Sequence, residues 1–591
     1  MAAPSGGLPR RVLIANRGEI AVRVIQACRE LGVSPVAVYS QADATSLHVR
    51  LADDAILIGP ARAAESYLNV PRLLAAARQA GADAVHPGYG FLSENADFAA
   101  ACEEAGLTFV GPTPAAIAAM GSKVAAKSLA RRLGVPLAPG SDGAVDTLEQ
   151  ALAVAGRIGY PLAIKAAAGG GGRGLKVVAE EAELAVAFDA ARREGQAYFG
   201  NPEVFIERYL RRPRHVEVQV LADGHGAVLT LGERDCSIQR NHQKLIEETP
   251  AMLSATLRRE MTQAAETLAR EIGYRSAGTV EFIVSGESYY FLEMNTRIQV
   301  EHTVTEMVTG IDLVQAQLRI AGGQELWLRQ QDVVPRGHAI QCRINAEDPA
   351  QGFRPGPGLV RAYRAPTGAG VRVDSALYAG YTVPGDYDSL VAKLVTWGAD
   401  RDEARRRMHR ALAELVVVGV PTTAPFHQHV MEDPAFVAGH VDTGYVGRVD
   451  LSLLPAAANL DLPAISAPVP PDEQALGPAR TFAVRVGGQA FTVEVAEVQA
   501  ADGRSGRRRD AVRRPTPSST ADGAVRSTMA GVVVRLDVGT GDRVEAGQTV
   551  CAVEAMKMEN DITAPRAGAV ARLHVAVGAA VEVGGLLLEI E

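Results

Sequence analysis

The chain has 591 residues, a hydrophobic fraction of 47%, a charged fraction of 22% and a formal net charge of -8. A prior of roughly 150 residues per domain indicates about four domains. No apolar run reaches the ~20 residues of a membrane helix, the N-terminus lacks the apolar core of a secretory signal, and the net negative charge gives no attraction to nucleic acid; we therefore expect a cytoplasmic protein without a membrane or nucleic-acid partner.

Residues 11 to 111 alternate short apolar runs such as "RVLIA" with helical patterns such as "EIAVRVIQACREL". This alternation predicts βαβ units around a parallel sheet, and hence an α/β domain over residues 1–113. The first turn reads "ANRGEIA" and lacks a GxGxxG, so NAD binding is not predicted.

From about residue 114 the pattern changes to hairpins and one amphipathic helix, "SATLRREMTQAAETLAREIG", which predicts an α+β domain over residues 114–325. "PLAIKAAAGGGGRGLKVV" predicts a strand, a glycine loop and a second strand. A helix does not follow this loop, as it would in a P-loop, so we expect a flap between two strands. Short strands and the helical run "DRDEARRRMHRALAELVV" predict a third, mixed unit over residues 326–448.

Residues 449–525 are predicted to be a linker with one hairpin. The segment is rich in proline and carries six arginines between Arg504 and Arg514. A solvated linker is the favoured interpretation of this run, and a docking patch for an acidic partner is the alternative. "TFAVRVGGQAFTVEV" alternates around two glycines, which predicts a β-hairpin that could dock to a partner.

The last 65 residues contain an internal repeat. Residues 530–554 match residues 567–591 at 11 of 25 positions without a gap. The repeat predicts an all-β barrel of two similar units over residues 526–591, with Lys557 of "EAMKMEN" at or near a hairpin tip. Two methionines flank this lysine, and apolar side chains at an exposed tip indicate that a partner protein binds there.

The "AMKM" stretch within duplicated strands resembles the biotin carboxyl carrier domain. That resemblance implies that a biotin protein ligase attaches biotin to Lys557. In the related lipoyl domains an aspartate usually precedes the lysine, and Met556 argues against that alternative.

Residues 11 to about 447 resemble biotin carboxylase, an ATP-grasp enzyme, in the stretches "ANRGEIA", "HPGYGFLSEN", "AAGGGGRG", "ERDCSIQRNHQK" and "EMNTRIQVEH". With the carrier, the chain resembles the α subunit of bacterial acyl-CoA carboxylases. The resemblance implies a multidomain fold with an α/β pre-ATP-grasp domain, an α+β ATP-grasp domain, a mixed C-terminal biotin-carboxylase domain and a flattened biotinyl/lipoyl-type barrel.

The activity implied is ATP- and bicarbonate-dependent carboxylation of biotin held on the same chain. A separate carboxyltransferase β subunit, in a hetero-oligomer, would then carboxylate acetyl-CoA, propionyl-CoA or a longer acyl-CoA, as in fatty acid biosynthesis. Two other function classes are the alternatives: a pure carrier with a degenerate N-terminal fold, and an ATP-grasp ligase that joins an amine to a carboxylate.

Glu281 and Glu293 flank a predicted turn at residues 286–288, so they should lie opposite each other on antiparallel strands. Paired carboxylates repel unless a cation lies between them, and hard oxygen ligands suit Mg²⁺ (or Mn²⁺) bridging ATP phosphates. By resemblance Asn295 belongs to the same metal shell. The alternative is a pair of solvent-facing glutamates.

Backbone N–H groups of the glycine loop can approach phosphates closely. By resemblance, the ATP-binding set comprises Lys123, Lys165, Gly171, Gly172, Glu207, Tyr209, Leu210, His215, Gln239 and His242. The loop departs from many relatives at Ala168, which is expected to stiffen it slightly.

In "NTRIQVEH", alternation would put Arg297, Gln299 and Glu301 on one face of an extended segment, which suits a small-anion site with a base. By resemblance Glu301 deprotonates bicarbonate and Arg343 stabilises the biotin enolate. The same resemblance assigns bicarbonate binding to Lys244, Arg297, Gln299 and the backbone of Val300. Thr303 stands where a proline is common, with no functional change expected.

Overall fold

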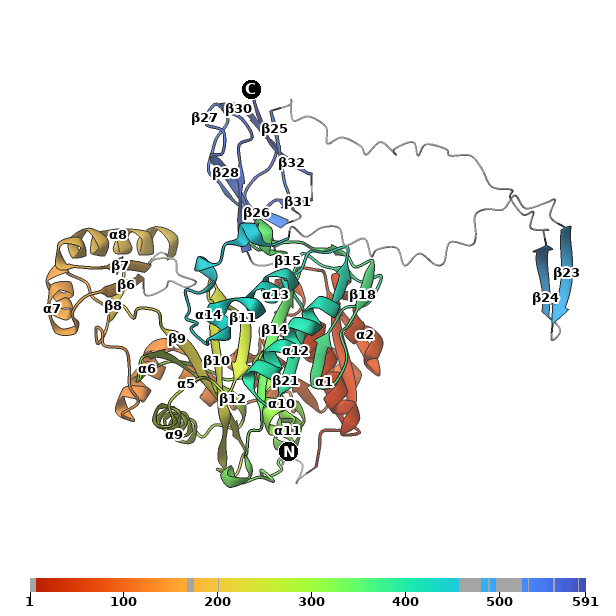
Figure 1. Cartoon of the computed structure of the whole chain (residues 1–591), viewed down its shortest axis with the longest axis horizontal. Helices are drawn as coiled ribbons and strands as arrows, with labels where there is room; N and C mark the ends of the chain where they lie inside the picture. The colour runs from red at the N-terminus through yellow and green to blue at the C-terminus, as the bar shows by residue number, and fades with distance from the viewer. Residues whose placement is uncertain are drawn as a thin grey trace.

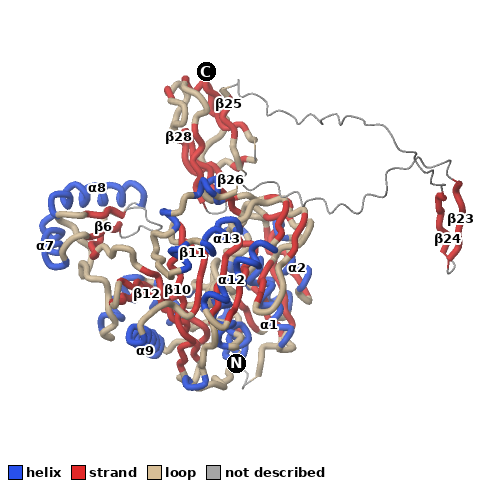
Figure 2. Tube along the Cα trace, in the orientation of Figure 1, coloured by secondary structure: helices blue, strands red, loops and turns tan. Residues whose placement is uncertain are grey.

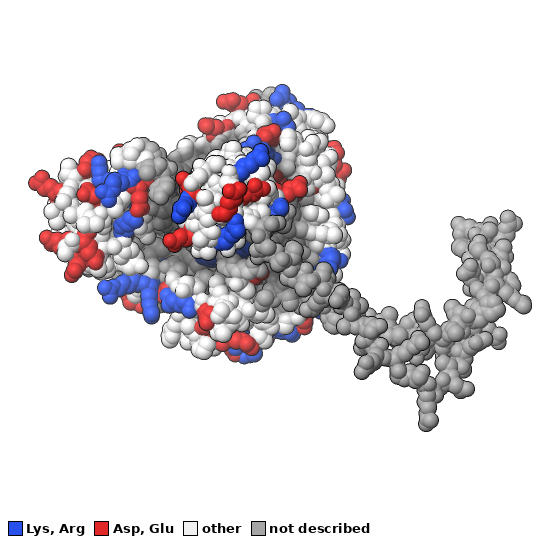
Figure 3. All heavy atoms as spheres, turned by 90° about the horizontal axis from the view of Figure 1, so that it is seen from above, with Lys and Arg blue, Asp and Glu red and all other residues white. Residues whose placement is uncertain are grey.

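The computed structural model describes residues 7–166, 175–199, 201–455, 480–486, 489–495, 523–529, 531–555, 558–582 and 584–591 (Figures 1 and 2). No helix in these ranges is long and apolar enough to cross a membrane. On the face seen in Figure 3, basic and acidic side chains are interspersed rather than gathered into one basic patch.

The N-terminal unit is a parallel sheet with helices, as predicted. Its five strands have the order β3-β2-β1-β4-β5, and every neighbouring pair is parallel. The strands are β1 (Arg11–Ile14), β2 (Ser34–Ser40), β3 (Asp54–Gly59), β4 (Ala84–His86) and β5 (Thr108–Phe109), with helices α1 (Gly18–Glu30), α3 (Val70–Ala80) and α4 (Ala96–Glu104).

A small lobe follows, at the left edge of Figure 1. Its antiparallel sheet has the order β7-β6-β8 and pairs Lys165 with Leu175. The strand–loop–strand prediction is therefore confirmed for its two strands, and the glycine loop, residues 167–174, lies outside the described residues. The elements of the lobe are α7 (Leu148–Ile158), β6 (Leu162–Ala166), β7 (Leu175–Val178), α8 (Glu181–Phe199) and β8 (Val204–Arg208). The preceding helix α6 (Lys123–Arg132) packs instead in the core of the large sheet described next, through Ala126 and Ala130.

One eight-stranded sheet forms the centre of the molecule, in the order β13-β12-β9-β10-β11-β14-β21-β19. It runs from the predicted ATP-grasp segment into the predicted third unit, because β11 pairs with β14 and places Ile246 opposite Cys342. The strands are β9 (Arg214–Ala222), β10 (Val228–Arg240), β11 (Gln243–Thr249), β12 (Ser276–Ser285), β13 (Ser288–Asn295), β14 (His338–Asn345), β19 (Val371–Ser375) and β21 (Leu390–Gly398).

Helices cover this sheet. The predicted amphipathic helix is α9 (Ala255–Glu271), and it begins where the Ser254 hydroxyl accepts a hydrogen bond from the Leu257 N–H. Its buried residues Leu257 and Met261 belong to the same apolar cluster as Val216 and Val218 of β9. Helices α10 (His302–Thr309), α11 (Leu313–Ala321) and α12 (Arg401–Glu414) complete the part of the fold used below.

The C-terminal domain is a β barrel built from the sequence repeat, as predicted. Its two sheets have the orders β25-β32-β30-β27 and β29-β28-β26-β31. Each repeat therefore contributes its two longer strands to one sheet and its short middle strand, β27 or β31, to the other sheet. The strands are β25 (Ala524–Arg526), β26 (Gly531–Leu536), β27 (Arg543–Val544), β28 (Thr549–Ala555), β29 (Met558–Thr563), β30 (Gly568–Leu573), β31 (Ala580–Val581) and β32 (Leu586–Ile590).

Strands β28 and β29 are antiparallel neighbours, and their pairing extends to Ala555 opposite Met558. Lys557, predicted to lie at this hairpin's tip, is outside the described residues. The other predicted hairpin is confirmed: β23 (Arg480–Val486) and β24 (Gln489–Val495) are antiparallel, with Val486 opposite Gln489.

Candidate active site

A row of charged residues crosses the large sheet from strand to strand. The strand register places Glu281 opposite both Glu217 and Glu293, and Arg234 opposite Glu217. The predicted opposition of Glu281 and Glu293 is therefore confirmed. Opposed residues share a face of the sheet, so the four side chains lie on one side.

Lys244 binds three of the carboxylates that gather there. Its Nζ donates hydrogen bonds to Glu217 (2.5 Å), Glu281 (2.9 Å) and Glu301 (2.7 Å). Burial alone would lower the pKa of Lys244, but the three carboxylates outweigh it and hold the pKa well above the ordinary value. The site therefore contains a permanently charged ammonium group.

Glu301 lies between two cations at the start of helix α10 and is 1% exposed. One carboxylate oxygen accepts from Lys244, and the other accepts from the Arg343 guanidinium at 2.9 Å. Burial would raise the pKa of Glu301, but Lys244 and Arg343 hold it below its ordinary value. Arg343 also donates to Glu247 at 2.5 Å, so the guanidinium is fixed from two sides.

The prediction that residues 297–301 form one extended, alternating face is wrong. Strand β13 ends at Asn295, and the chain bends and turns through residues 296–301 before α10 begins. Gln299 points into the charged cluster, donating to Glu281 (2.8 Å) and accepting from Arg234 (2.7 Å).

Arg297 lies at the edge of the cluster instead. Its guanidinium donates to Glu94 at 2.9 Å and to the side-chain oxygen of Asn295 at 2.7 Å. Asn295 in turn donates to Glu281 at 2.8 Å. Asn295 at the end of β13 and Gln299 in the turn thus both bind Glu281, and Arg297 is linked to it through Asn295.

The oxygen donors at Glu281, Glu293 and Asn295 fit a hard divalent cation. Burial and the Glu281 carboxylate raise the pKa of Glu293 above its ordinary value, which is the repulsion that a cation would relieve. Lys123 Nζ is 3.9 Å from the Glu293 carboxylate and 74% exposed in its side chain, so it is a weak counter-ion. Carboxylate and amide oxygens are ligands that Mg²⁺ accepts.

At the other end of the cluster, Glu207 accepts from Lys127 (2.5 Å) and Lys165 (2.6 Å). Burial would raise the pKa of Glu207, but Lys165 and Lys127 lower it to about 2. Lys127 lies one helical turn after Lys123 on α6. The predicted ATP-binding lysines, Lys123 and Lys165, therefore form a group with Lys127.

His215 and Gln239 lie beside Glu281, one of the candidate metal ligands. His215 Nε2 is 3.0 Å from Glu281, and Gln239 lies 3.4 Å from the other ring nitrogen. Burial and His215 lower the pKa of His242. Tyr209 and Leu210 follow directly after β8, and Gly171 and Gly172 are outside the described residues.

Sequence reasoning missed several residues of this cluster. Glu217 and Arg234 are almost fully buried and bind each other at 2.6 Å, and Glu247 and Glu94 hold the two predicted arginines. A signal was available in "VEVQV", where Glu217 and Gln219 alternate with valines, because a charge that is buried on such a strand needs a partner.

Comparison with known families matches four segments of the chain. Residues 9–117 match "Biotin carboxylase, N-terminal domain", and residues 122–329 match "Carbamoyl-phosphate synthase L chain, ATP binding domain". Residues 341–448 match "Biotin carboxylase C-terminal domain", and residues 523–590 match "Biotin-requiring enzyme".

Individual proteins agree with these families. The chain is 56% identical over 440 residues to biotin carboxylase of Pseudomonas aeruginosa, covering 74% of this chain and 98% of that protein. It is 52% identical over 437 residues to a subunit of the pyruvate carboxylase of Methanothermobacter thermautotrophicus, covering 74% of this chain and 89% of that protein.

Among solved structures, the chain is similar to the biotin carboxylase domain dimer of Hydrogenobacter thermophilus 2-oxoglutarate carboxylase in complex with MgADP, ADP and bicarbonate. The TM-score is 0.70 and the identity 47%, covering 75% of this chain and 98% of that one. Biotin, ATP and Mg²⁺ are accordingly the cofactors of this enzyme. The chain belongs to the biotin carboxylase family and carries a biotin-requiring-enzyme domain on the same polypeptide.

Proposed function

We propose that this chain is the α subunit of an acyl-CoA carboxylase. ATP and bicarbonate carboxylate biotin that a biotin protein ligase has attached to Lys557, and a separate carboxyltransferase β subunit passes the carboxyl group to acetyl-CoA, propionyl-CoA or a longer acyl-CoA. The observation that carries the catalytic part is the contact of Glu301 with both Lys244 and Arg343. These three side chains put a base beside two cations.

In this proposal the nucleotide lies along the lysines and the metal ligands. Mg²⁺ held by Glu281, Glu293 and Asn295 would offset the negative charge of the ATP phosphates. The remaining nucleotide contacts are assigned to Lys123, Lys165, Gly171, Gly172, Glu207, Tyr209, Leu210, His215, Gln239 and His242.

Glu301 is proposed to take the proton of bicarbonate. In the structure both of its oxygens are bound by cations, which makes it a weak base. Bicarbonate binding at Lys244, Arg297, Gln299 and the Val300 N–H would bring a second anion to these cations. Because the anion then shares their positive charge, the pKa of Glu301 would rise toward the range in which it accepts a proton. Arg343 would stabilise negative charge that develops on biotin.

Glu293→Gln should weaken metal-dependent ATP turnover and leave the stability of the metal-free protein unchanged or slightly higher. The pKa of Glu293 is raised in the fold, so ionisation of this carboxyl group costs stability, and stability should rise as the pH falls through that pKa. Turnover at varied Mg²⁺ and thermal unfolding in EDTA measure the two effects. Intact turnover with a large loss of metal-free stability would make the carboxylate structural.

Residues 449–525 are proposed to carry the contact with the partner. The register of β23 and β24 puts Phe482 opposite Val493 and Val484 opposite Phe491, so one face of this hairpin is apolar by sequence. A two-stranded hairpin is marginally stable in water by itself, which favours a partner surface against this face.

The acceptor is tested by co-purifying the chain with its native partner and supplying radiolabelled bicarbonate, ATP and a panel of acceptors. We expect label in acyl-CoA with the partner present, and none with this chain alone. A 2-oxo acid acceptor is the second candidate, because the relatives above include parts of a pyruvate carboxylase and of a 2-oxoglutarate carboxylase. Labelled oxaloacetate without labelled acyl-CoA would favour it.

A further inference from the structure

Lysine is rare in this chain, which has seven lysines among its 60 basic residues. Two of them, Lys127 and Lys176, form ion pairs with Glu207 and Glu194. A third, Lys393 on β21, is fully buried. The lysine ammonium group is compact, whereas the guanidinium group of arginine is planar and larger. Arginine therefore cannot take the place of a lysine in a confined space. The other four are the lysines assigned above: Lys123, Lys165, Lys244 and Lys557.

Lys393 holds the turn that precedes the proposed base. Its Nζ donates to the carbonyl oxygen of Val300 at 3.2 Å. Two carboxylates accompany it, Glu19 of α1 at 3.1 Å and Asp374 of β19 at 3.7 Å. The ammonium group therefore joins the N-terminal unit and the large sheet to this turn.

His302 holds the preceding peptide of the same turn. Its Nδ1 is 2.7 Å from the carbonyl oxygen of Gln299. A carbonyl can only accept, so Nδ1 carries the hydrogen. Burial and the charge of Lys393 keep the pKa of His302 well below its ordinary value, which keeps the ring neutral.

These two contacts fix consecutive peptide planes. The Gln299 carbonyl shares a rigid peptide with the Val300 N–H, and the Val300 carbonyl shares the next one with the Glu301 N–H. Both holding side chains, Lys393 and His302, are 0% exposed. The turn is thus supported by side chains other than those that contact Glu301, which are Lys244 and Arg343.

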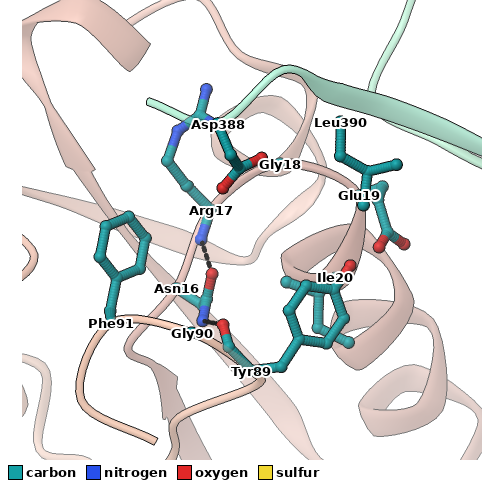
Figure 4. A pocket seen from close by; sticks show the side chains of 10 residues that line it. All are labelled: Asn16, Arg17, Gly18, Glu19, Ile20, Tyr89, Gly90, Phe91, Asp388 and Leu390. Carbon is teal, nitrogen blue, oxygen red and sulfur yellow. Dashed lines mark hydrogen bonds between the residues drawn. The ribbon is translucent and has the colours of Figure 1, made fainter. Parts of the chain in front are cut away.

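Figure 4 shows the surroundings of the Lys393 counter-ion. Glu19 and Tyr89 both line a small cavity of about 50 Å³. The Lys393 Nζ is 5.8 Å from the centre of the Tyr89 ring, so an aromatic face adds to the two carboxylates around the ammonium group.

We propose that Lys393 and His302 are positioning residues for bicarbonate: they orient the two peptides so that the Val300 N–H and the Glu301 carboxylate meet the same anion. The inference rests on the proposed bicarbonate site at this turn. A merely structural ion pair would stabilise the fold without affecting bicarbonate in particular.

The test uses the full chain and measures bicarbonate-dependent release of phosphate from ATP with free biotin. Lys393→Met should raise the KM for bicarbonate by about tenfold or more, the loss expected for one charge-assisted hydrogen bond. The KM for ATP should stay within about twofold, since no nucleotide contact changes. An unchanged bicarbonate KM would overturn the proposal.

Loss of the ammonium group also leaves Glu19 without its cation, so a second variant separates folding from positioning. Lys393→Met combined with Glu19→Gln should recover thermal stability but keep the raised bicarbonate KM. Recovery of both would show a structural role only, and would overturn the proposal.

Arg23→Met is the matched control. Arg23 is buried and also pairs two carboxylates, Glu306 at 3.1 Å and Asp312 at 2.7 Å, neither of which belongs to the turn at residues 296–301. It should lose stability with no selective change in bicarbonate KM, and an equal selective change would overturn the proposal. The wild-type assay distinguishes failure of this proposal from failure of the proposed function. If the wild-type protein shows no bicarbonate-dependent ATP turnover, the proposed function itself is wrong.

Discussion

Glu301→Gln is expected to lower biotin carboxylation by about 10²–10⁴-fold, the range for loss of a general base. The amide keeps the size of the side chain but cannot take a proton from bicarbonate. ATP affinity should stay within about twofold, because Glu301 contacts Lys244 and Arg343 rather than the proposed nucleotide ligands. Nucleotide binding by calorimetry and carboxylation of free biotin measure the two quantities.

Glu306→Gln is the matched control for this substitution. Glu306 is also buried, lies on the same helix α10, and pairs with Arg23 and Arg372 instead of the active-site cations. It should lose stability but keep carboxylation per folded molecule. If Glu301→Gln carboxylated biotin at the wild-type rate, Glu301 would not be the base.

Lys557→Arg is expected to abolish biotinylation and with it the complete reaction. The ligase must acylate an amine, and a guanidinium is a poor nucleophile because it stays protonated. Lys557 is the only lysine between residues 523 and 591, so no neighbouring lysine in that range can substitute. A streptavidin blot measures the modification.

Carboxylation of free biotin should survive in Lys557→Arg, because the proposed catalytic residues lie outside the barrel. Lys176→Arg, a surface lysine paired with Glu194 on the catalytic part, serves as control and should remain biotinylated. A positive blot for Lys557→Arg would remove this residue as the attachment site.

Features set by local pattern were predictable from the sequence. The strand–helix alternation before residue 111 predicted the parallel sheet, and the repeat predicted the barrel, because short-range periodicity decides both. The opposition of Glu281 and Glu293 was predicted from a turn centred on residue 287. The strands pair Ser285 with Ser288, and a register shift between Glu281 and Phe282 then brings Glu281 opposite Glu293.

Features that depend on distant pairing were not predictable in this way. Strands β11 and β14 are separated by residues 250–337, and no local pattern indicates their pairing, which makes two expected units share one sheet.

The charged cluster combines both cases. Lys244, Gln299, Glu301 and Arg343 were assigned through resemblance, and the structure brings them together from β11, the turn before α10, and β14. The bend after Asn295 was missed because alternating side chains favour an extended segment, whereas the buried bonds of Gln299 to Glu281 and Arg234 select a turn.

Transfer of radiolabelled bicarbonate to the biotinylated full-length chain tests the central claim most directly. After ATP, Mg²⁺ and labelled bicarbonate are added without any partner, we expect acid-labile label on the wild-type protein that requires ATP and is lost in both Glu301→Gln and Lys557→Arg. Label that forms without ATP, or that persists in either variant, would contradict the proposal that this site carboxylates biotin on its own chain.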